Sequence, residues 1–433
     1  MSPAEQDAHL LLADVYRADW GRLLGGLIRR HCRPDLAEDA LAEAFASASA
    51  SWPADGVPAN PPGWLAHVAS RRVLDALRHE STARAKAPLL AVAEAVLADD
   101  DGFPGADLLR GVAGQPTSPA AGRLPGVDVD DRLPLLFMAT HPALAPEVRP
   151  ALALRFVLGV PTADIAALFL VPTATMAARL TRAKGRLRAI GVGFTMPDPQ
   201  VWPERVDDVA RAIYLAFTAG YAPREGEQVV RVAVAGEAVR LAALAAHLLP
   251  GQPVLDALTA LLVLQHARRD ARAGPDGDLV RLADQDRSTW YAGEIAVGLA
   301  TLTRLTPGTG YAEELRLQAL VAAFHDTAPT SGATDWAAIA RTYARLEDLT
   351  GSPIVRLNRA VAVAEIAGPM AGLAVLQAAA DQLPGHHRVA VVRAELLRRD
   401  GDREGARTAY GQAVATCPDG PERRHLLRRL ASL

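Results

Sequence analysis

Apolar residues recur along most of the chain at spacings of three and four, the pattern of helices that bury one face. No stretch of the sequence alternates polar and apolar residues over a useful strand length. The pattern predicts helices over about residues 8–50, broken near His31–Pro34, and a further helix over 63–84. A Pro- and Gly-rich loop at 51–62 precedes that helix, and Asn60 is placed to cap it. We therefore expect an all-α fold.

The charge pattern changes sign within the first 190 residues, which indicates separate segments. Residues 88–131 carry eight acids and two arginines with scattered glycine and proline, a composition typical of an acidic linker. Residues 132–190 carry eight basic residues and two acids. This basic segment predicts three short helices, at about 144–157, 162–169 and 173–189.

The helical pattern continues from about residue 196 to the C-terminus and contains a repeat. Two sets of small, large and proline residues lie 34 residues apart, the length of a tetratricopeptide repeat. The later set is Ala394, Leu397, Gly401, Ala406, Tyr410, Ala413 and Pro418, and the earlier set is Ala360, Val363, Ala367, Gly372, Leu376, Ala379 and Pro384. The repeat predicts a C-terminal α-solenoid, with a generic Ala-rich bundle as the alternative.

Residues 161–190 have the pattern of a helix–turn–helix. Ile165, Ala166 and Phe169 give the first helix an apolar face. The second helix has an apolar stripe at helical spacing, consisting of Met176, Leu180, Ala183 and Leu187. Such a helix packs on its own domain while its exposed side enters an anionic groove. The residues that we expect to face DNA are Thr173, Thr175, Arg179, Arg182, Lys184 and Arg186, with Arg188 beside them. A solvated basic helix face is the alternative.

A second basic element is the helix that begins near Trp64. An aromatic-bearing loop with Trp52 precedes it, so the pair can hold a nucleic-acid backbone and trap unstacked bases. The residues expected to contact nucleic acid here are Trp64, Arg71, Arg72 and Arg78. The alternative for Trp64 is a place in the hydrophobic core.

Together these segments resemble sigma factors of the sigma-70 family, of the extracytoplasmic-function type. Asp35–Phe45 looks like the helix that docks on the clamp of core RNA polymerase. The helix from Trp64 is similar to the one that opens and reads the −10 element, and His141–Arg188 is similar to the −35-binding domain. The docking residues that the resemblance implies are Asp35, Asp39 and Glu43.

The remaining sequence resembles one subgroup of this family, whose members carry a long tetratricopeptide-like helical extension. The matching pieces are Phe137 with His141–Leu144, Phe217 with Gly220–Tyr221, Asp284–Arg287 with Trp290, and Leu357–Ala362. In that subgroup the extension is thought to be needed for activity, which implies intramolecular contact with it and no dedicated anti-sigma factor. The implied domains are a region 2-like domain at 1–87, the acidic linker at 88–131, a region 4-like domain at 132–195 and the helical extension at 196–433.

Composition narrows the class of protein further. The 433 residues have a net charge of −3, so a nucleic-acid site must be a local basic patch. The two cysteines, Cys32 and Cys417, lie at opposite ends and fit neither a disulfide scaffold nor a zinc cluster. No apolar run approaches the ~18 residues of a membrane span, and the N-terminus lacks a basic signal-peptide region. We expect a soluble cytoplasmic protein without a metal, cofactor or membrane partner.

Catalysis has little support in the sequence. The most suggestive polar group is Asp284, Asp286, His325 and Asp335, whose spacing matches no ligand motif. We therefore predict a non-enzymatic transcription initiation factor that docks on core RNA polymerase, recognises −35 and −10 promoter DNA and assists strand opening. A stand-alone helix–turn–helix regulator with a tetratricopeptide-like sensor domain, and an enzyme housed in the C-terminal helices, remain as alternatives.

Overall fold

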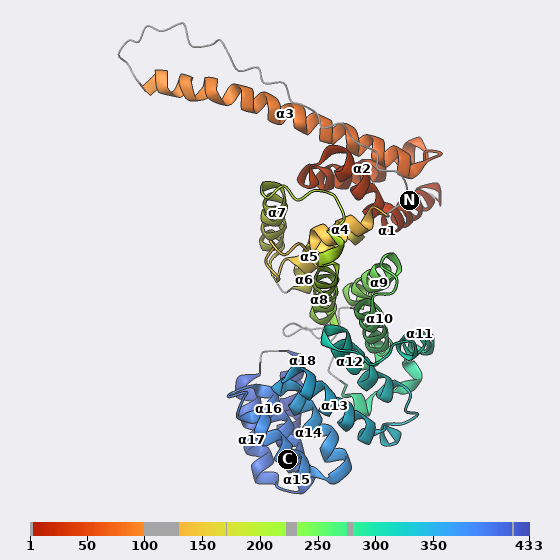
Figure 1. Ribbon diagram of the computed structural model, residues 1–433, viewed down its shortest axis with the longest axis vertical. Coiled ribbons are helices and arrows are strands. Elements are labelled where there is room, and N and C mark those ends of the chain that lie inside the picture. Colours follow the sequence, from red (N-terminus) through yellow and green to blue (C-terminus); the bar gives the residue numbers. More distant parts are fainter. Residues whose placement is uncertain (1–2, 99–129, 170, 222–231, 275–279, 418–419) are drawn as a thin grey trace. The chain divides into compact units, whose positions relative to one another are not determined.

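The computed structural model describes residues 3–98, 130–169, 171–221, 232–274, 280–417 and 420–433. Every regular element in these ranges is a helix, which confirms the all-α prediction (Figure 1). Contacts between Cα atoms divide the chain into two compact units, Met1–Asp131 and Arg132–Leu433. Each unit is described by itself.

The described part of unit 1 contains three helices, which are α1 (Pro3–His31), α2 (Pro34–Asp55) and α3 (Pro61–Ala98). The predicted break between the first two is confirmed, and Cys32 there has a positive φ of 54°. Tyr16 and Trp20 of α1 pack against Phe45 of α2, with ring centroids 4.8 and 5.8 Å from that of Phe45. Asn60 caps α3 as expected, because its Oδ1 accepts the backbone N–H of Gly63 at 3.0 Å.

Two element boundaries in unit 1 differ from the prediction. Helix α2 continues to Asp55, into the segment expected to be a loop. It does so because Trp52 is buried and packs against Trp64, with the two ring centroids 5.6 Å apart. Helix α3 continues to Ala98 rather than ending near residue 84 and so includes the first part of the expected acidic linker. Residues 99–129 of that linker lie outside the described part of the chain.

Unit 2 begins with four short helices, which are α4 (Arg132–Ala139), α5 (Arg149–Leu158), α6 (Thr162–Leu168) and α7 (Thr173–Ala189). Helices α6 and α7 match the prediction. Helix α5 starts at Arg149 rather than near residue 144, since residues 141–148 form turns. Helix α4 was not predicted, although Leu133 to Ala139 are all buried.

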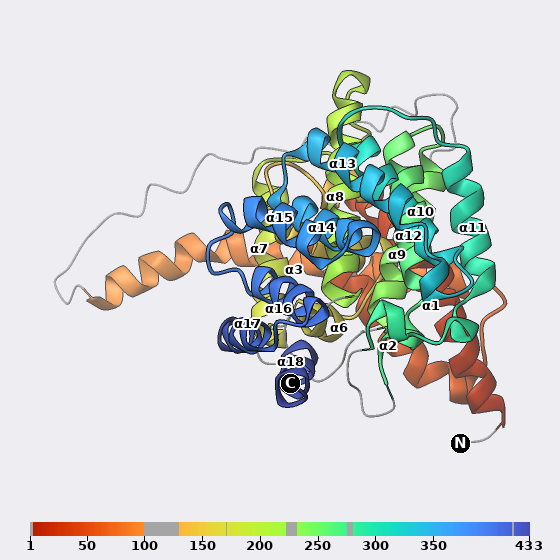
Figure 2. The same ribbon diagram turned by 90° about the horizontal axis from the view of Figure 1, so that it is seen from below.

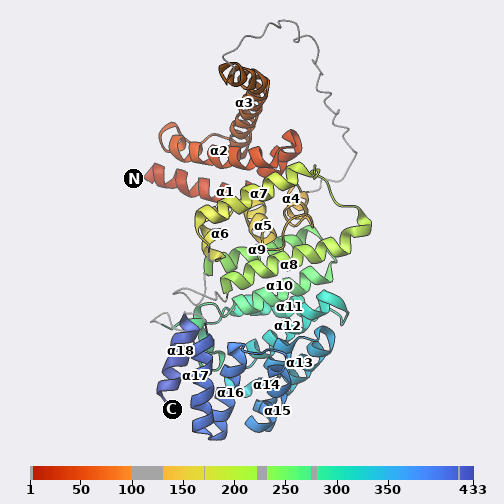
Figure 3. The same cartoon turned by 90° about the vertical axis from the view of Figure 1, so that its left-hand side faces the viewer.

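The next helices pack directly on this group (Figures 1 and 3). They are η1 (Pro199–Val201), α8 (Trp202–Tyr221) and α9 (Val232–Leu248). Buried Arg205 of α8 donates a hydrogen bond to the carbonyl of Phe137 in α4, and Asp208 of α8 pairs with Arg149 of α5 at 3.0 Å. Helices α4 to α9 therefore share one core.

The rest of unit 2 continues as paired helices. They are α10 (Pro253–His266), η2 (Asp270–Arg272), η3 (Leu282–Asp284), η4 (Arg287–Thr289), α11 (Ala292–Thr303), α12 (Gly310–Asp326), η5 (Ser331–Ala333), α13 (Trp336–Thr350), α14 (Pro353–Ala367), α15 (Pro369–Ala380), α16 (His387–Asp400), α17 (Arg403–Thr416) and α18 (Pro421–Ala431). The pairs α14–α15 and α16–α17 are the two copies of the 34-residue repeat, and each pair packs side by side (Figures 2 and 3).

The small repeat positions lie where the paired helices meet. Ala360 and Ala394 are completely buried, and a Cβ on Gly372 would lie 2.6 Å from the Ala364 side chain. Tyr410, the large residue of the second copy, is buried and donates its hydroxyl to Glu395 at 2.8 Å. The repeat pattern thus corresponds to close packing of paired helices. Its last residue, Pro418, lies outside the described residues.

Among the described helices, none is by itself long and apolar enough to cross a membrane. Helices α6 and α7 pass that test only as a pair bent by 107°, on length and composition alone.

Candidate nucleic-acid interface

The second helix of the predicted helix–turn–helix, α7, is held by the apolar stripe that the sequence indicates. Met176, Leu180, Ala183 and Leu187 are all at most 5% exposed. On the first helix, α6, Ile165 and Ala166 are buried as predicted, but the third buried residue is Leu168 rather than the half-buried Phe169. The stripe fixes which side of α7 is left for solvent.

That solvent side carries basic and hydroxyl side chains. Thr173, Thr175, Arg182 and Arg186 are exposed, and Arg179 is half-buried. Within the described chain, the side chains of the three arginines make no hydrogen bond or ion pair. Together with Glu147 they line a hollow of about 480 Å³ between α7 and the turn before α5. Three guanidinium groups are thus available at one surface for an anionic ligand.

Lys184 does not belong to this surface, contrary to the prediction. It is only 8% exposed, while the neighbouring arginines face solvent. It follows Leu180 by four residues and therefore lies on the same side of α7 as the apolar stripe. The structure gives no support for Lys184 as a DNA contact.

Other basic residues of this segment have structural roles. Arg149 donates to the carbonyls of Pro142 and Leu144 as well as to Asp208. The guanidinium of Arg155 lies within hydrogen-bonding distance of the carbonyls of Gly159 and Val160. Counting charges along the sequence overestimates the basic surface, because these two arginines hold turns together.

In unit 1, the residues expected at the −10 element differ in their surroundings. Arg71 and Arg78 are exposed, and Arg78 pairs with Asp75 of the preceding turn at 2.7 Å. Trp64 is half-buried beside Trp52, with the two ring centroids 5.6 Å apart. The half-buried Arg72 bonds to Glu43 and Ser47 of α2.

The residues expected to dock on polymerase lie along α2. Asp35 is held by Arg33, which also binds Glu80 of α3, and these hydrogen bonds raise the pKa of Arg33. Asp39 and Glu43 are exposed one turn apart. Because Glu43 pairs with Arg72, one expected docking residue contacts one expected −10 residue.

The polar residues considered for catalysis do not form one site. Asp286 and Asp335 cap η4 and α13 by accepting the backbone N–H groups of Ser288 and Ala338. The exposed Asp284 pairs with Arg281. The side chain of His325 forms no hydrogen bond or ion pair with them in the described structure and packs against Trp336, with the two ring centroids 5.3 Å apart.

His325 belongs instead to a charged cluster at the end of α12 that sequence reasoning missed. Arg287 donates to its backbone carbonyl, and Arg268 lies 3.3 Å from the fully buried Asp326. Both arginines lie over the Trp290 ring. Burial lowers the pKa of His325 to about 4 and raises the pKa of Asp326 to about 6. In the sequence, the only sign of this cluster is the pair Arg287 and Trp290, three residues apart.

A cavity of about 520 Å³ adjoins this cluster between α10, α12, α13 and α14. Its polar lining includes Arg268, His325, Gln265, Asn358 and Arg388. In the described structure the side chains of the last three form no hydrogen bond or ion pair. The cavity therefore offers amide and guanidinium donors to a small polar molecule.

The family comparisons agree with the helix–turn–helix geometry. The family model for sigma-70, region 4, matches residues 135–187, which span α4 to α7. The chain therefore carries a sigma-70 region 4 domain, the −35-recognition domain, and this supports a sigma-factor-like role in transcription. A second model, a family of unknown function (DUF6596), matches residues 205–306, from α8 into the C-terminal helices.

The similarity to a whole protein extends along nearly all of the chain. The uncharacterized protein R00370 of Rhizobium meliloti (strain 1021) is 37% identical over 415 residues, which cover 95% of this chain and 93% of that protein. The chain belongs to the same family as this relative. No solved structure matches this chain significantly.

Proposed function

We propose that this chain is a transcription initiation factor of the extracytoplasmic-function type, which docks on core RNA polymerase and directs it to promoters. The observation that carries the proposal is the region 4 match over α4–α7 together with three unpaired arginines on the exposed side of α7. In this function Arg179 and Arg182 contact the −35 element with Thr173 and Thr175, while Arg186 holds a phosphate. The chain acts by binding and strand capture, without covalent chemistry.

Unit 1 supplies the polymerase and −10 contacts in this proposal. Asp39 and Glu43 present carboxylates to the polymerase from α2. Arg71 and Arg78 hold the DNA backbone, and Trp64 stacks on an unpaired base. The Glu43–Arg72 pair links the docking helix to the DNA-contacting helix, as does Arg33, which binds both Asp35 and Glu80.

The helices after residue 196 form a tetratricopeptide-like extension that replaces a separate anti-sigma factor. Its contact with the DNA-binding helices runs through Arg205 and Asp208 of α8. A signal molecule has a place to bind in the cavity with Asn358 and Arg388. The same cavity favours the second candidate function, a stand-alone helix–turn–helix regulator with a sensor domain.

Comigration with core RNA polymerase in gel filtration separates the two functions. We expect the full chain to comigrate at micromolar concentration, and Asp39→Arg to weaken this by reversing the charge on α2. Asp55→Arg is the matched control, since Asp55 is exposed at the far end of the same helix. A chain that binds duplex promoter DNA but never comigrates is the stand-alone regulator. Equal behaviour of the two variants would contradict docking through Asp39.

A further inference from the structure

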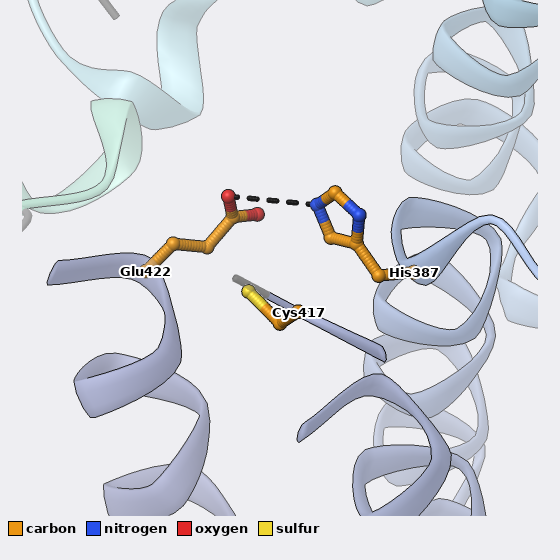
Figure 4. A group of neighbouring side chains, drawn as sticks. All are labelled: His387, Cys417 and Glu422. Carbon is orange, nitrogen blue, oxygen red and sulfur yellow. Dashed lines mark ion pairs between the residues drawn. The ribbon is translucent and has the colours of Figure 1, made fainter. Parts of the chain in front are cut away.

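Three side chains with metal-binding atoms meet where three successive helices begin or end (Figure 4). His387 is the first residue of α16, Cys417 directly follows α17, and Glu422 lies in the first turn of α18. One ligand atom from each residue lies within 4.8 Å of the other two. Cys417 follows His387 by 30 residues, and Glu422 follows Cys417 by five, so no short sequence motif indicates this group.

The surroundings of these atoms differ from those of an ordinary surface ion pair. Cys417 is only 7% exposed, in a cluster with Tyr410 and Leu426. The Nε2 of His387 is buried and makes no hydrogen bond in the described structure. It faces a carboxylate oxygen of Glu422 at 3.6 Å, beyond hydrogen-bonding distance. A buried imidazole nitrogen, a buried thiol and a half-exposed carboxylate thus point into one small space.

The spacing of the group fits a tetrahedral metal ion. Bonds of about 2.0–2.3 Å from nitrogen, oxygen and sulfur to zinc place neighbouring ligand atoms about 3.3–3.6 Å apart in a tetrahedron. His387 and Glu422 are already 3.6 Å apart. The longest separation, at most 4.8 Å, has to shorten by about 1 Å, which side-chain rotation supplies.

We propose that His387, Cys417 and Glu422 bind a Zn²⁺ ion. A thiolate and an imidazole favour zinc over magnesium or calcium, which take oxygen ligands. On binding, the Cys417 thiol releases its proton to solvent, and the three protein ligands leave the fourth position to water. The ion links the start of α16, the end of α17 and the start of α18, so it clamps the last helix onto the second repeat.

Metal analysis of the purified full chain tests this proposal. We expect one equivalent of zinc by mass spectrometry after loading with Zn²⁺ and removal of the excess. Titration of the zinc-free chain with Co²⁺ should give a thiolate-to-cobalt charge-transfer absorption that saturates at one equivalent. Cys417→Ser should abolish this absorption and lower zinc affinity by at least about 100-fold. Cys32→Ser, which removes the other thiol of the chain, should change neither.

A second pair of variants guards against misfolding of the buried cysteine variant. Glu422→Gln removes a half-exposed ligand, and Glu404→Gln removes an exposed acid from the first turn of α17, so both affect a helix N-terminus alike. Only Glu422→Gln should weaken zinc binding and lessen the rise in thermal midpoint that zinc produces. No cobalt–thiolate absorption in the unmodified chain, equal effects of the two glutamine variants, or an absorption that depends on Cys32 would overturn the site.

Discussion

The exposed side of α7 should determine how strongly DNA binding depends on salt. Arg182→Ala with Arg186→Ala removes two guanidinium groups that have no partner in the described structure, so the folded domain loses no ion pair. On a duplex of arbitrary sequence, which has no −35 element, both arginines contact phosphates. Each phosphate contact contributes about 0.9 to the slope of log K against log salt concentration, so the double variant should have a slope less steep by about 1.8. From 50 to 200 mM salt, the unmodified chain should then lose about twelvefold more affinity than the variant.

Fluorescence anisotropy with a labelled duplex of about 30 base pairs, read at several salt concentrations, measures both slopes. Arg403→Ala with Arg407→Ala is the matched control. These arginines are exposed on α17 one turn apart, and their removal changes the net charge by the same amount. The reasoning fails if the α7 variant keeps the original slope, or if the α17 variant flattens the slope equally.

Three further substitutions test the packing of unit 2 through urea denaturation. Asp326→Asn removes the acid beside His325. Burial lowers the pKa of His325 to about 4 in the folded state, below its pKa in the unfolded chain. Between these two pKa values the unfolded chain binds a proton at His325 that the folded chain does not. The contribution of His325 to the free energy of unfolding should therefore rise by ~3 kcal/mol from pH 4 to 6.5. In the unmodified chain the rise is largely cancelled below pH 6, because the folded state holds a proton on Asp326, whose pKa burial raises to about 6. Arg205→Met leaves the Phe137 carbonyl without its donor and should cost about 1–3 kcal/mol. Gly372→Val places a Cβ 2.6 Å from an α14 side chain and should cost about 1–3 kcal/mol. A flat pH profile for the first variant, or unchanged stability of the others, would contradict these assignments.

The recognition helix could be predicted because its apolar stripe has a strict helical spacing. Met176 and Leu180 fix the buried side, and every exposed basic residue then follows from its position relative to them. The error at Lys184 came from judging the residue by its charge. Four residues after Leu180, it points into the same seam, and this position could have been recognised from the sequence alone.

The long-range partners of the arginines could not be predicted in the same way. Arg149 meets Asp208 across 59 residues, and Arg72 meets Glu43 across 29 residues. Helical periodicity says which side of a helix is buried but not which helix covers it. In a chain whose positive charge is almost all arginine, the sequence therefore cannot separate an arginine that holds a turn from one left for DNA.

The packing of α8 changes how the C-terminal helices should be tested. Phe137 and Leu152 of the region 4 helices are buried, and α8 packs on both of their helices, with the ring centroid of Trp202 6.3 Å from that of Phe137. A chain cut after about residue 200 loses α8 and exposes that apolar surface, so we expect it to be poorly folded. Loss of transcription on truncation would then follow from damage to the DNA-binding domain whether or not the extension senses a signal. Substitutions at the cavity, such as Arg388→Ala, leave the shared core intact, and only they can separate a sensing role from a structural one.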